Sequence, residues 1–369
     1  MKKLFSGFLT VLLSVLFLSC GREEVPPPPD TDSETLNQLL NGAPFSRINL
    51  HESGADTLML PGGQVVDRFP IGGETRRFRG PDQVVVHGEQ LVVLEYTNPE
   101  LYVLNREGES IRILNSGDQL SRPTAIMSDG TNLYVYDDDE KTLARFDSQL
   151  EYQESVSFRN PYFMPGSVGM NRSYILYQPD EATGFRVSET DKKLLTVVRN
   201  DQAHTTAEEL MPRIIPSGKQ PGGFNNLTFS INRENSIVAA YPALPYIFIF
   251  HEFEHSHTIL FDEEPFAAIE NPPLSPFQPV MGEAVSVRSL IDYLHITDHG
   301  DVLVFSQGEL FHLKTEKSGT YTLSSRYVLV RGDTGERINS LSSISNVPDD
   351  PDRFYGTGDG ILFGLILPG

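Results

Sequence analysis

The chain has one cysteine and no tryptophan among its 369 residues. A single cysteine cannot form a disulfide within the chain, so no cross-link limits the freedom of the unfolded state. Phenylalanine and tyrosine, 22 and 14 in number, supply the large apolar side chains instead. We therefore expect a fold that is stabilised by core packing alone.

Basic residues are also scarce. The chain has 29 Lys and Arg against 50 Asp and Glu, which gives a formal net charge of −21. Such an acidic surface argues against nucleic acid and against anionic membrane surfaces as partners. The length allows one large β domain or two smaller domains.

Only one long apolar run occurs, from Leu4 to Leu18, directly after Lys2 and Lys3. A run of about 15 residues is shorter than the roughly 20 that a membrane-spanning helix needs. A basic start, a short apolar region and a small residue at its end are typical of a secretory signal peptide. We assign residues 1–19 to this signal.

The signal ends in Phe17-Leu18-Ser19-Cys20, which resembles the lipobox of bacterial lipoproteins, where a small residue precedes the cysteine. The resemblance implies that Cys20 is the lipidated first residue of the mature chain. An ordinary secretory signal with a chance cysteine is the alternative. Gly21, in place of a retention aspartate, implies the outer membrane. Arg22-Glu23-Glu24 resembles the acidic export signal of some Bacteroidota-type lipoproteins or is a solvated linker, so periplasmic and surface-facing positions both stay open.

Residues 20–45 are expected to form a lipidated, disordered tether, because Val25–Pro29 favours extended polyproline. A single domain over residues 46–369 follows. Helical spacing of apolar residues is weak throughout, and the best short helix candidates are Glu34–Asn41 and Thr206–Met211.

Short alternating segments broken by Gly, Asn, Asp and Pro predict β-strands along the rest of the chain. Four of them lie close together, at Gln83–His87, Gln90–Tyr96, Leu101–Asn105 and Ser110–Leu114. The pattern returns 42 positions later, where Pro123–Met127 aligns with Pro81–Val86 and Leu133–Asp138 aligns with Leu91–Tyr96. Leu143–Asp147 likewise aligns with Leu101–Asn105.

A repeat of about 40 to 50 residues with four strands is typical of a β-propeller blade. Later units are looser, and the third carries an insertion at Asn200–Asn225. The last unit is one strand short. Asp56–Leu60 and Gln64–Pro70 belong to no complete unit, so one of them could complete the last blade and close the ring. The sequence therefore predicts an all-β, six-bladed propeller with four-stranded antiparallel blades and an N-terminal strand in the last blade.

The motif Pro-x-x-apolar, then Leu-Tyr-Val-Tyr-Asp, then Leu-x-x-Phe-Asp spans Pro123–Asp147, and Pro81–Asn105 follows it closely. It resembles the six-bladed propellers of the NHL and TolB-like superfamily, particularly lipoproteins of Bacteroidota-like bacteria. The resemblance implies a fold and leaves the activity open, because propellers serve many functions.

His251-Glu252-Phe253-Glu254-His255 matches the H-E-x-x-H motif of zinc proteases, which requires a helix to bring the two histidines together. Its aromatic and β-branched surroundings predict a strand end or a β-turn instead. His255 and His257, taken as neighbours on one strand face, stay weak candidates for a metal site. The acidic turn Asp137–Glu140 offers Asp137 and Asp139 as weak Ca²⁺ ligands, or is simply a solvated turn.

Two loop segments are candidates for functional surface, since long loops in compact domains often serve function. One is Asn200–Asn225, with His204, Arg213, Lys219 and Phe224 as weak binding candidates, and the other is Pro265–Pro279. No nucleophile elbow, P-loop or dinucleotide motif occurs, and no cofactor or catalytic residue is indicated.

The sequence favours a monomeric, lipid-anchored envelope module that binds a ligand or protein. The alternative is a propeller hydrolase or lyase with an axial divalent metal, similar to gluconolactonase or streptogramin lyase. That alternative requires acids and histidines from several blades to meet on the axis.

Overall fold

The computed structural model describes residues 34–50, 54–60, 65–66, 68–71, 74–78, 80–95, 100–114, 119–158, 168–179, 193–201, 204–213, 225–261 and 289–368. Within these ranges the chain forms the helix α2 (Glu34–Gly42) and a long series of β-strands. None of these ranges contains a helix with the length and apolar character of a membrane span.

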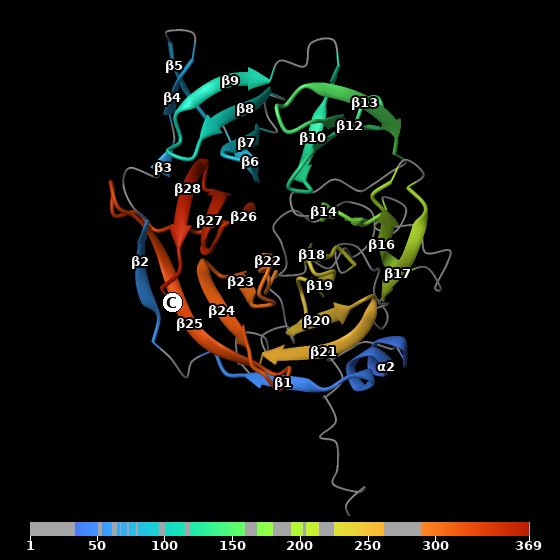
Figure 1. The fold of residues 1–369 in the computed structure, drawn as a ribbon. Coiled ribbons are helices and arrows are strands. Elements are labelled where there is room, and N and C mark those ends of the chain that lie inside the picture. The colour runs from blue at the N-terminus through green and yellow to red at the C-terminus, as the bar shows by residue number, and fades with distance from the viewer. Residues whose placement is uncertain are drawn as a thin grey trace, which may run out of the picture.

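The strands form six blades around a central axis, as Figure 1 shows from one end of that axis. In each blade the first four strands, counted from the axis outward, run antiparallel. Blade 1 contains β6 (Pro81–His87), β7 (Gln90–Glu95), β8 (Glu100–Asn105) and β9 (Ser110–Leu114); blade 2 contains β10 (Pro123–Ser128), β11 (Leu133–Asp137), β12 (Thr142–Phe146) and β13 (Tyr152–Ser157); blade 3 contains β14 (Val168–Met170), β15 (Tyr174–Tyr177), β16 (Lys193–Arg199) and β17 (Thr206–Pro212).

Blades 4 to 6 receive additional strands from the N-terminal part of the chain. Blade 4 contains β18 (Thr228–Ile231), β19 (Ser236–Ala240), β20 (Tyr246–His251), β21 (Glu254–Phe261) and β1 (Phe45–Ile48); blade 5 contains β22 (Tyr293–Ile296), β23 (Val302–Ser306), β24 (Glu309–Thr315), β25 (Tyr321–Arg331) and β2 (Asp56–Leu60); blade 6 contains β26 (Ser343–Val347), β27 (Asp350–Gly358), β28 (Ile361–Ile366) and β3 (Val65–Val66). The predicted six-bladed propeller is confirmed.

Ring closure also follows the prediction. Strand β3 lies within the segment Gln64–Pro70 and pairs antiparallel with β28, where Val66 faces Leu362. It supplies the outer strand that blade 6 lacks. The hairpin of β4 (Arg68–Ile71) and β5 (Glu74–Arg77) follows directly and leads into blade 1.

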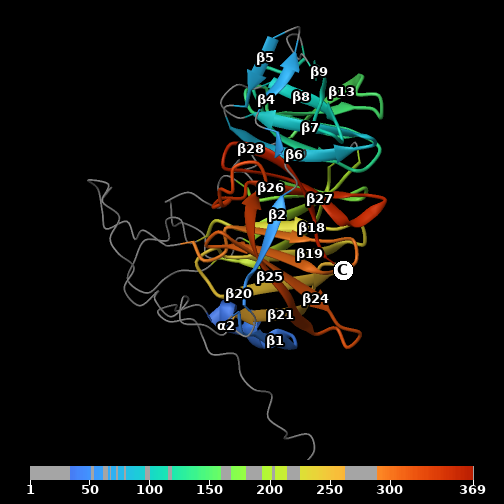
Figure 2. The same ribbon diagram turned by 90° about the vertical axis from the view of Figure 1, so that its left-hand side faces the viewer.

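The N-terminal segment does more than close the ring. Strand β1 pairs in parallel with β21, and β2 pairs in parallel with β25, so blades 4 and 5 each have five strands. We call α2, β1, β2 and β3 together the belt. Figures 1 and 2 show it along the outer rim of three consecutive blades.

The belt begins with α2, which corrects the expected extent of the tether. Leu36 and Leu40 on this helix are fully buried against blades 3 and 4. The packed structure therefore already includes Glu34–Gly42, earlier than the expected domain boundary at residue 46. The helix candidate Glu34–Asn41 is confirmed, because its leucines are spaced to share one face.

The second helix candidate, Thr206–Met211, is wrong. These residues form β17, the outer strand of blade 3, which pairs with β16. The segment Asn200–Asn225 is thus no simple insertion, because it contains the fourth strand of its blade. Pairing with a neighbouring strand overrides a local helical pattern of this length.

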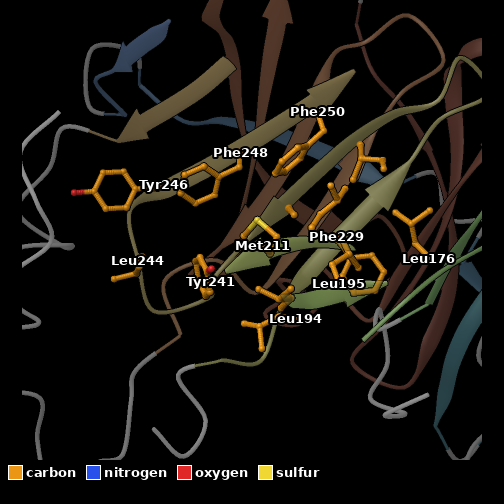
Figure 3. Packing of buried hydrophobic residues seen from close by; sticks show 14 of the residues in the cluster. Leu176, Leu194, Leu195, Met211, Phe229, Tyr241, Leu244, Tyr246, Phe248 and Phe250 are labelled. Atoms are coloured by element: carbon orange, nitrogen blue, oxygen red, sulfur yellow. The ribbon is translucent and has the colours of Figure 1, made fainter. Parts of the chain in front are cut away.

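The apolar core consists of six clusters, one between each pair of neighbouring blades. Alternation along a strand sends successive side chains to opposite faces. On β7, for example, Leu91 and Val93 pack toward blade 6, while Val92 and Leu94 pack toward blade 2. Figure 3 shows the cluster between blades 3 and 4, where Phe229, Phe248 and Tyr241 meet Leu194 and Leu195.

Candidate functional site

A cavity of about 180 Å³ lies on the propeller axis and is lined by residues from the innermost strands of all six blades. These strands are β6, β10, β14, β18, β22 and β26, which surround the centre of Figure 1. Because no blade has a further strand on the axial side, the backbone edges of these six strands face the cavity. Their side chains and the turns that follow them therefore define the site.

Side chains join the innermost strands across the blade boundaries. At five of the six boundaries a side chain on one blade binds the strand or the strand end of the next blade, which satisfies backbone groups that have no β-partner. The pairs are Gln83 Oε1 with Ile126 N (2.8 Å), Asn171 Nδ2 with Asn232 O (2.8 Å), Asn232 Nδ2 with Thr297 O (3.0 Å), Tyr293 OH with Ile344 N (2.9 Å), Ser343 Oγ with Val84 N (2.9 Å) and Ser345 Oγ with Val86 N (2.9 Å). The innermost strands of the cavity wall are accordingly joined by polar contacts at these five boundaries.

His295 is the histidine of this wall. Its Nε2 lies 2.6 Å from Asn346 Oδ1, so that nitrogen carries the proton and donates to the amide oxygen. Burial lowers the pKa of His295, and the bond to Asn346 opposes that shift. The imidazole is therefore neutral near pH 7 and serves the contact between blades 5 and 6.

One end of the cavity is bordered by the turns that follow the innermost strands. The first residue of each turn is Gly88, Gly130, Arg172, Arg233, Asp298 and Pro348 for blades 1 to 6, and all but Gly88 line the cavity. We call these six positions the rim. Charged side chains occupy the rim on blades 3, 4 and 5, whereas the other three blades carry glycine or proline.

On blades 2, 3 and 4 the side chain of the residue before the rim position fixes the turn. Asn171 Oδ1 accepts hydrogen bonds from the backbone N–H groups of Ser173 and Tyr174. Asp129 plays the same part in blade 2 for Thr131 and Asn132. Side-chain oxygens of Asn and Asp commonly replace backbone acceptors in this way. The rim side chains are therefore held by rigid turns.

Arg233 forms an ion pair with Asp298 across the boundary between blades 4 and 5, with Nε and Oδ2 3.3 Å apart. Asp298 Oδ1 also lies 3.4 Å from the backbone N–H of Arg233. The guanidinium of Arg172 is exposed and has no acidic partner among the residues that the structure describes. Arg172 is thus the unpaired charge of the rim.

The acidic-turn candidates lie elsewhere. Asp137 is fully buried at the end of β11, and its two oxygens accept hydrogen bonds from the backbone N–H groups of Ser121, Arg122, Asp139 and Glu140. Its side chain therefore pins the segment that enters blade 2. Asp139 is exposed and pairs with Arg122, with Nε and Oδ1 3.3 Å apart.

The H-E-x-x-H segment is a hairpin, as its surroundings predicted. Strand β20 ends at His251, Glu252 and Phe253 form the turn with positive φ angles of 49° and 70°, and β21 begins at Glu254. In the register, Phe250 faces His255, so His251 and His255 point to opposite faces of the sheet. The two histidines cannot bind one metal in this arrangement.

The expectation that His255 and His257 share a strand face is wrong. A register shift in β21 places His255 opposite Phe250 and His257 opposite Ile249, which turns the two rings to opposite faces. His255 packs against Phe248 and Phe250, whereas His257 contacts Tyr321 and shares a hydrogen bond with Ser46. In the described ranges no three His, Cys, Asp or Glu side chains are placed to hold a metal ion.

Of the loop candidates, Lys219 and Phe224 lie outside the described residues, as do Cys20 and Pro265–Pro279. His204 and Arg213 flank β17, one at each end, and are separated by the length of a seven-residue strand, roughly 23 Å. His204 packs edge-on against Phe158 with ring centroids 5.5 Å apart. The structure does not bring these two residues into one site.

A second hollow, of about 460 Å³, lies between blades 4 and 5. Three histidines line it, His251, His257 and His299, together with Glu234. Ser46 Oγ accepts a hydrogen bond from the backbone N–H of Tyr321 and is also hydrogen-bonded to His257 Nε2, 2.8 Å away. This part of the hollow fastens the belt strand β1 to both blades.

Comparison with known proteins yields structural likeness only. No family model matches the chain, and no curated protein matches its sequence. One similar solved structure is a Bacteroides fragilis NCTC 9343 protein described as exported, with 12% sequence identity, a TM-score of 0.49 and an alignment that covers 88% of this chain and 99% of that chain. The β-propeller domain of Cps50 (Swd1) from Myceliophteria thermophila has 11% identity and a TM-score of 0.45, and the alignment covers 80% of this chain and 99% of that chain. The C-terminal WD40 domain of Sif2 has 11% identity and a TM-score of 0.39, and the alignment covers 86% of this chain and 100% of that chain.

The sequence alone did not single out Arg172, Arg233 or Asp298 as candidate site residues. A usable signal was present, because Asn-Arg occurs both at Asn171-Arg172 and at Asn232-Arg233, each time directly after an innermost strand. The pattern could have been recognised only with the third and fourth blades correctly divided.

Proposed function

We propose that the protein is a lipid-anchored, extracytoplasmic binding module whose propeller holds a small polar ligand in the axial cavity. The observation that carries this proposal is the cavity itself, to which all six blades contribute. Its wall combines amide, hydroxyl and backbone groups with apolar side chains such as Val85 and Val168, and arginine lies at one end. A rigid wall of this kind, in which a few placed polar groups set the orientation of the ligand, suits a small polar molecule.

The titratable side chains of the wall are already engaged with neighbouring groups, which supports binding more than catalysis. His295 is engaged with Asn346, Asp298 is paired with Arg233, and Asp129 is occupied by its own turn. Three carboxylates or histidines converging from different blades would be needed for an axial metal, and the described residues offer no such group.

The lipid anchor rests on the N-terminal sequence, with Cys20 as the acylated residue. It predicts that Cys20→Ala releases the protein from the membrane fraction into the soluble fraction. Retention of the variant in washed membranes would defeat the anchor assignment. We further propose membership of the NHL and TolB-like propellers and attachment to the outer membrane.

Binding in the cavity is tested by filling it. Val85 on blade 1 and Val168 on blade 3 are half-buried in the wall, and phenylalanine at either position would occupy the cavity. We expect Val85→Phe and Val168→Phe to lose small molecules that the native protein captures from an envelope extract, as detected by native mass spectrometry. Ile111→Phe, exposed on β9, is the matched control. Capture that both cavity variants retain would contradict the proposal.

A further inference from the structure

We propose that the ligand of the axial cavity carries a carboxylate group, which binds at the rim between Arg172 and Arg233. This inference rests on the proposed binding function and specifies the ligand for that same cavity. It is drawn from the repeated geometry of blades 3 and 4 and from the charges on the rim.

The two arginines occupy equivalent places. Each follows an asparagine whose Oδ1 accepts two backbone N–H groups of its own turn, at 2.9 Å for Asn171 and at 2.9 and 3.0 Å for Asn232. The Nδ2 groups of both asparagines bind the backbone of the following blade. The two Cα positions of the arginines are therefore fixed on neighbouring blades by the same hydrogen bonds, and both side chains line one cavity.

The charges at the rim balance, although the chain as a whole is strongly acidic. Arg172 and Arg233 carry two positive charges, and Asp298 and the neighbouring Asp129 carry two negative charges, whereas the whole chain carries −21. The oxygens of Asp129 accept hydrogen bonds from Thr131, Asn132 and Tyr134, so its carboxylate is directed to its own turn. An anion that approaches the cavity is therefore repelled less here than over the acidic surface as a whole.

Arginine recognises carboxylates through two parallel N–H donors, which gives a strong and directional contact. Asp298 takes up one side of Arg233, through Nε. Arg172 has no acidic partner among the described residues, so its guanidinium is the principal anchor. Asp298 is a positioning residue that holds Arg233 toward the same ligand.

The rest of the ligand is expected to be uncharged and polar. Beyond the rim the cavity offers Ser345, Asn346 and Gln83, which are neutral donors and acceptors. Pro348 on blade 6 lies across the axis from Arg172 on blade 3, and Gly130 on blade 2 lies next to Arg172; neither adds charge at the rim. A volume of about 180 Å³ admits a small acid or the last residues of a peptide and excludes a folded partner.

The test uses the full-length protein in detergent, with sodium acetate as the minimal carboxylate and acetamide as its neutral isostere. The Nε–Hε signals of arginine are followed by ¹⁵N nuclear magnetic resonance at constant ionic strength. We expect acetate, and not acetamide, to shift the Arg172 and Arg233 signals saturably. Arg172→Gln should weaken the acetate response of Arg233 by about tenfold, as expected for loss of a hydrogen bond to a charged group.

Arg122→Gln is the matched control, because Arg122 is also exposed and its loss changes the net charge equally. Equal responses of the two variants, or equal shifts with acetate and acetamide, would overturn the carboxylate proposal. Loss of envelope ligands in Val85→Phe together with an unchanged Arg172→Gln would reject the carboxylate and leave the binding function standing. If neither Val85→Phe nor Arg172→Gln loses binding, both the carboxylate proposal and the binding function are rejected.

Two further probes distinguish the sources of the carboxylate. D-Glucuronate is compared with D-glucose, and trialanine is compared with its C-terminal amide. A stronger response to glucuronate indicates a free sugar acid or similar small acid, whereas a stronger response to trialanine indicates a chain terminus. If neither acid binds better than its neutral counterpart, the carboxylate proposal fails.

Discussion

Asn171 and Asn232 hold equivalent places on neighbouring blades, and the Nδ2 group of the first donates to the backbone oxygen of the second at 2.8 Å. Asn232 repeats the contact with Thr297 of the next blade at 3.0 Å. Both side chains are almost completely buried. One residue type thus fixes its own turn and joins three blades in succession.

Replacing either asparagine should destabilise the ring. Asn171→Ala leaves two turn N–H groups without partners and removes one of the hydrogen bonds to the oxygen of Asn232, and such a buried loss costs about 1–3 kcal/mol. The measurement is the free energy of unfolding in urea. Asn105→Ala is the control, because Asn105 also fixes a turn but is exposed and joins no second blade in the contacts shown. A loss in the control as large as in Asn171→Ala would contradict the role in joining blades.

The belt strand β2 allows a matched pair of substitutions. Leu60 is fully buried between blades 5 and 6, while Met59 beside it is 52% exposed. Leu60→Ala should lower the free energy of unfolding by about 2–5 kcal/mol, because it removes buried methyl groups and leaves a cavity. Met59→Ala should change it by less than about 1 kcal/mol. Similar losses for the two would mean that β2 contributes little to the core.

Gly358, at the end of β27, has no space for a side chain. A Cβ atom there would lie 2.1 Å from the backbone oxygen of Ser340, which cannot move without shifting the segment that enters blade 6. We expect Gly358→Ala to cost about 3 kcal/mol or more, at the upper end of overpacking effects. Gly80→Ala is the control, because a Cβ atom at Gly80 meets nothing within 4 Å. Thermal unfolding of the two variants distinguishes these outcomes, and equal midpoints would refute the predicted clash.

Acid should destabilise the protein through His255. Burial lowers the pKa of His255 from 6.5 to about 4, and Nε2–H donates to the backbone oxygen of His257, which opposes the shift. Between pH 6.5 and about 4 the unfolded chain binds a proton that the folded chain does not, so stability falls as the pH falls through this window. Above pH 6.5 the group is neutral in both states and contributes nothing to the pH dependence.

The full effect is up to roughly 3 kcal/mol below pH 4. It is measured as the slope of unfolding free energy against pH. His255→Gln, which keeps a donor, should flatten the slope in this window, whereas His299→Gln, at an exposed position, should leave it unchanged. An unaltered slope in His255→Gln would show that other groups govern the acid response.

The sequence predicted the ring and its closure because both depend on local alternation and on the length of a repeat. The Asn105 and Asp147 turns, 42 positions apart, show the same hydrogen bonds and confirm the alignment of the first two blades. Local pattern did not reveal β1 and β2 as fifth strands, because their partners lie more than 200 positions away. Thr206–Met211 failed for a different reason, because its partner β16 lies close by in the sequence and pairing with it overrides the local helical pattern.

The candidate metal ligands show a second limit to what the sequence can predict. Strand alternation places His255 and His257 on one face, but one extra residue in β21 reverses this, and a bulge leaves no clear mark in sequence. Arg172 and Arg233 illustrate the converse. Each looks like an ordinary surface arginine, and only the closure of the ring brings them to one cavity.

The belt also sets an order of events during biosynthesis. Residues 34–66 leave the ribosome before any blade is made, yet their partners are Thr258–Phe261, Tyr327–Arg331 and Leu362–Phe363, more than 200 positions further along the chain. Pairing across such separations is slow to form and has to wait until almost the whole chain has been made. The belt therefore stays unpaired for much of the synthesis, and it can dock completely only when the full-length chain has been made.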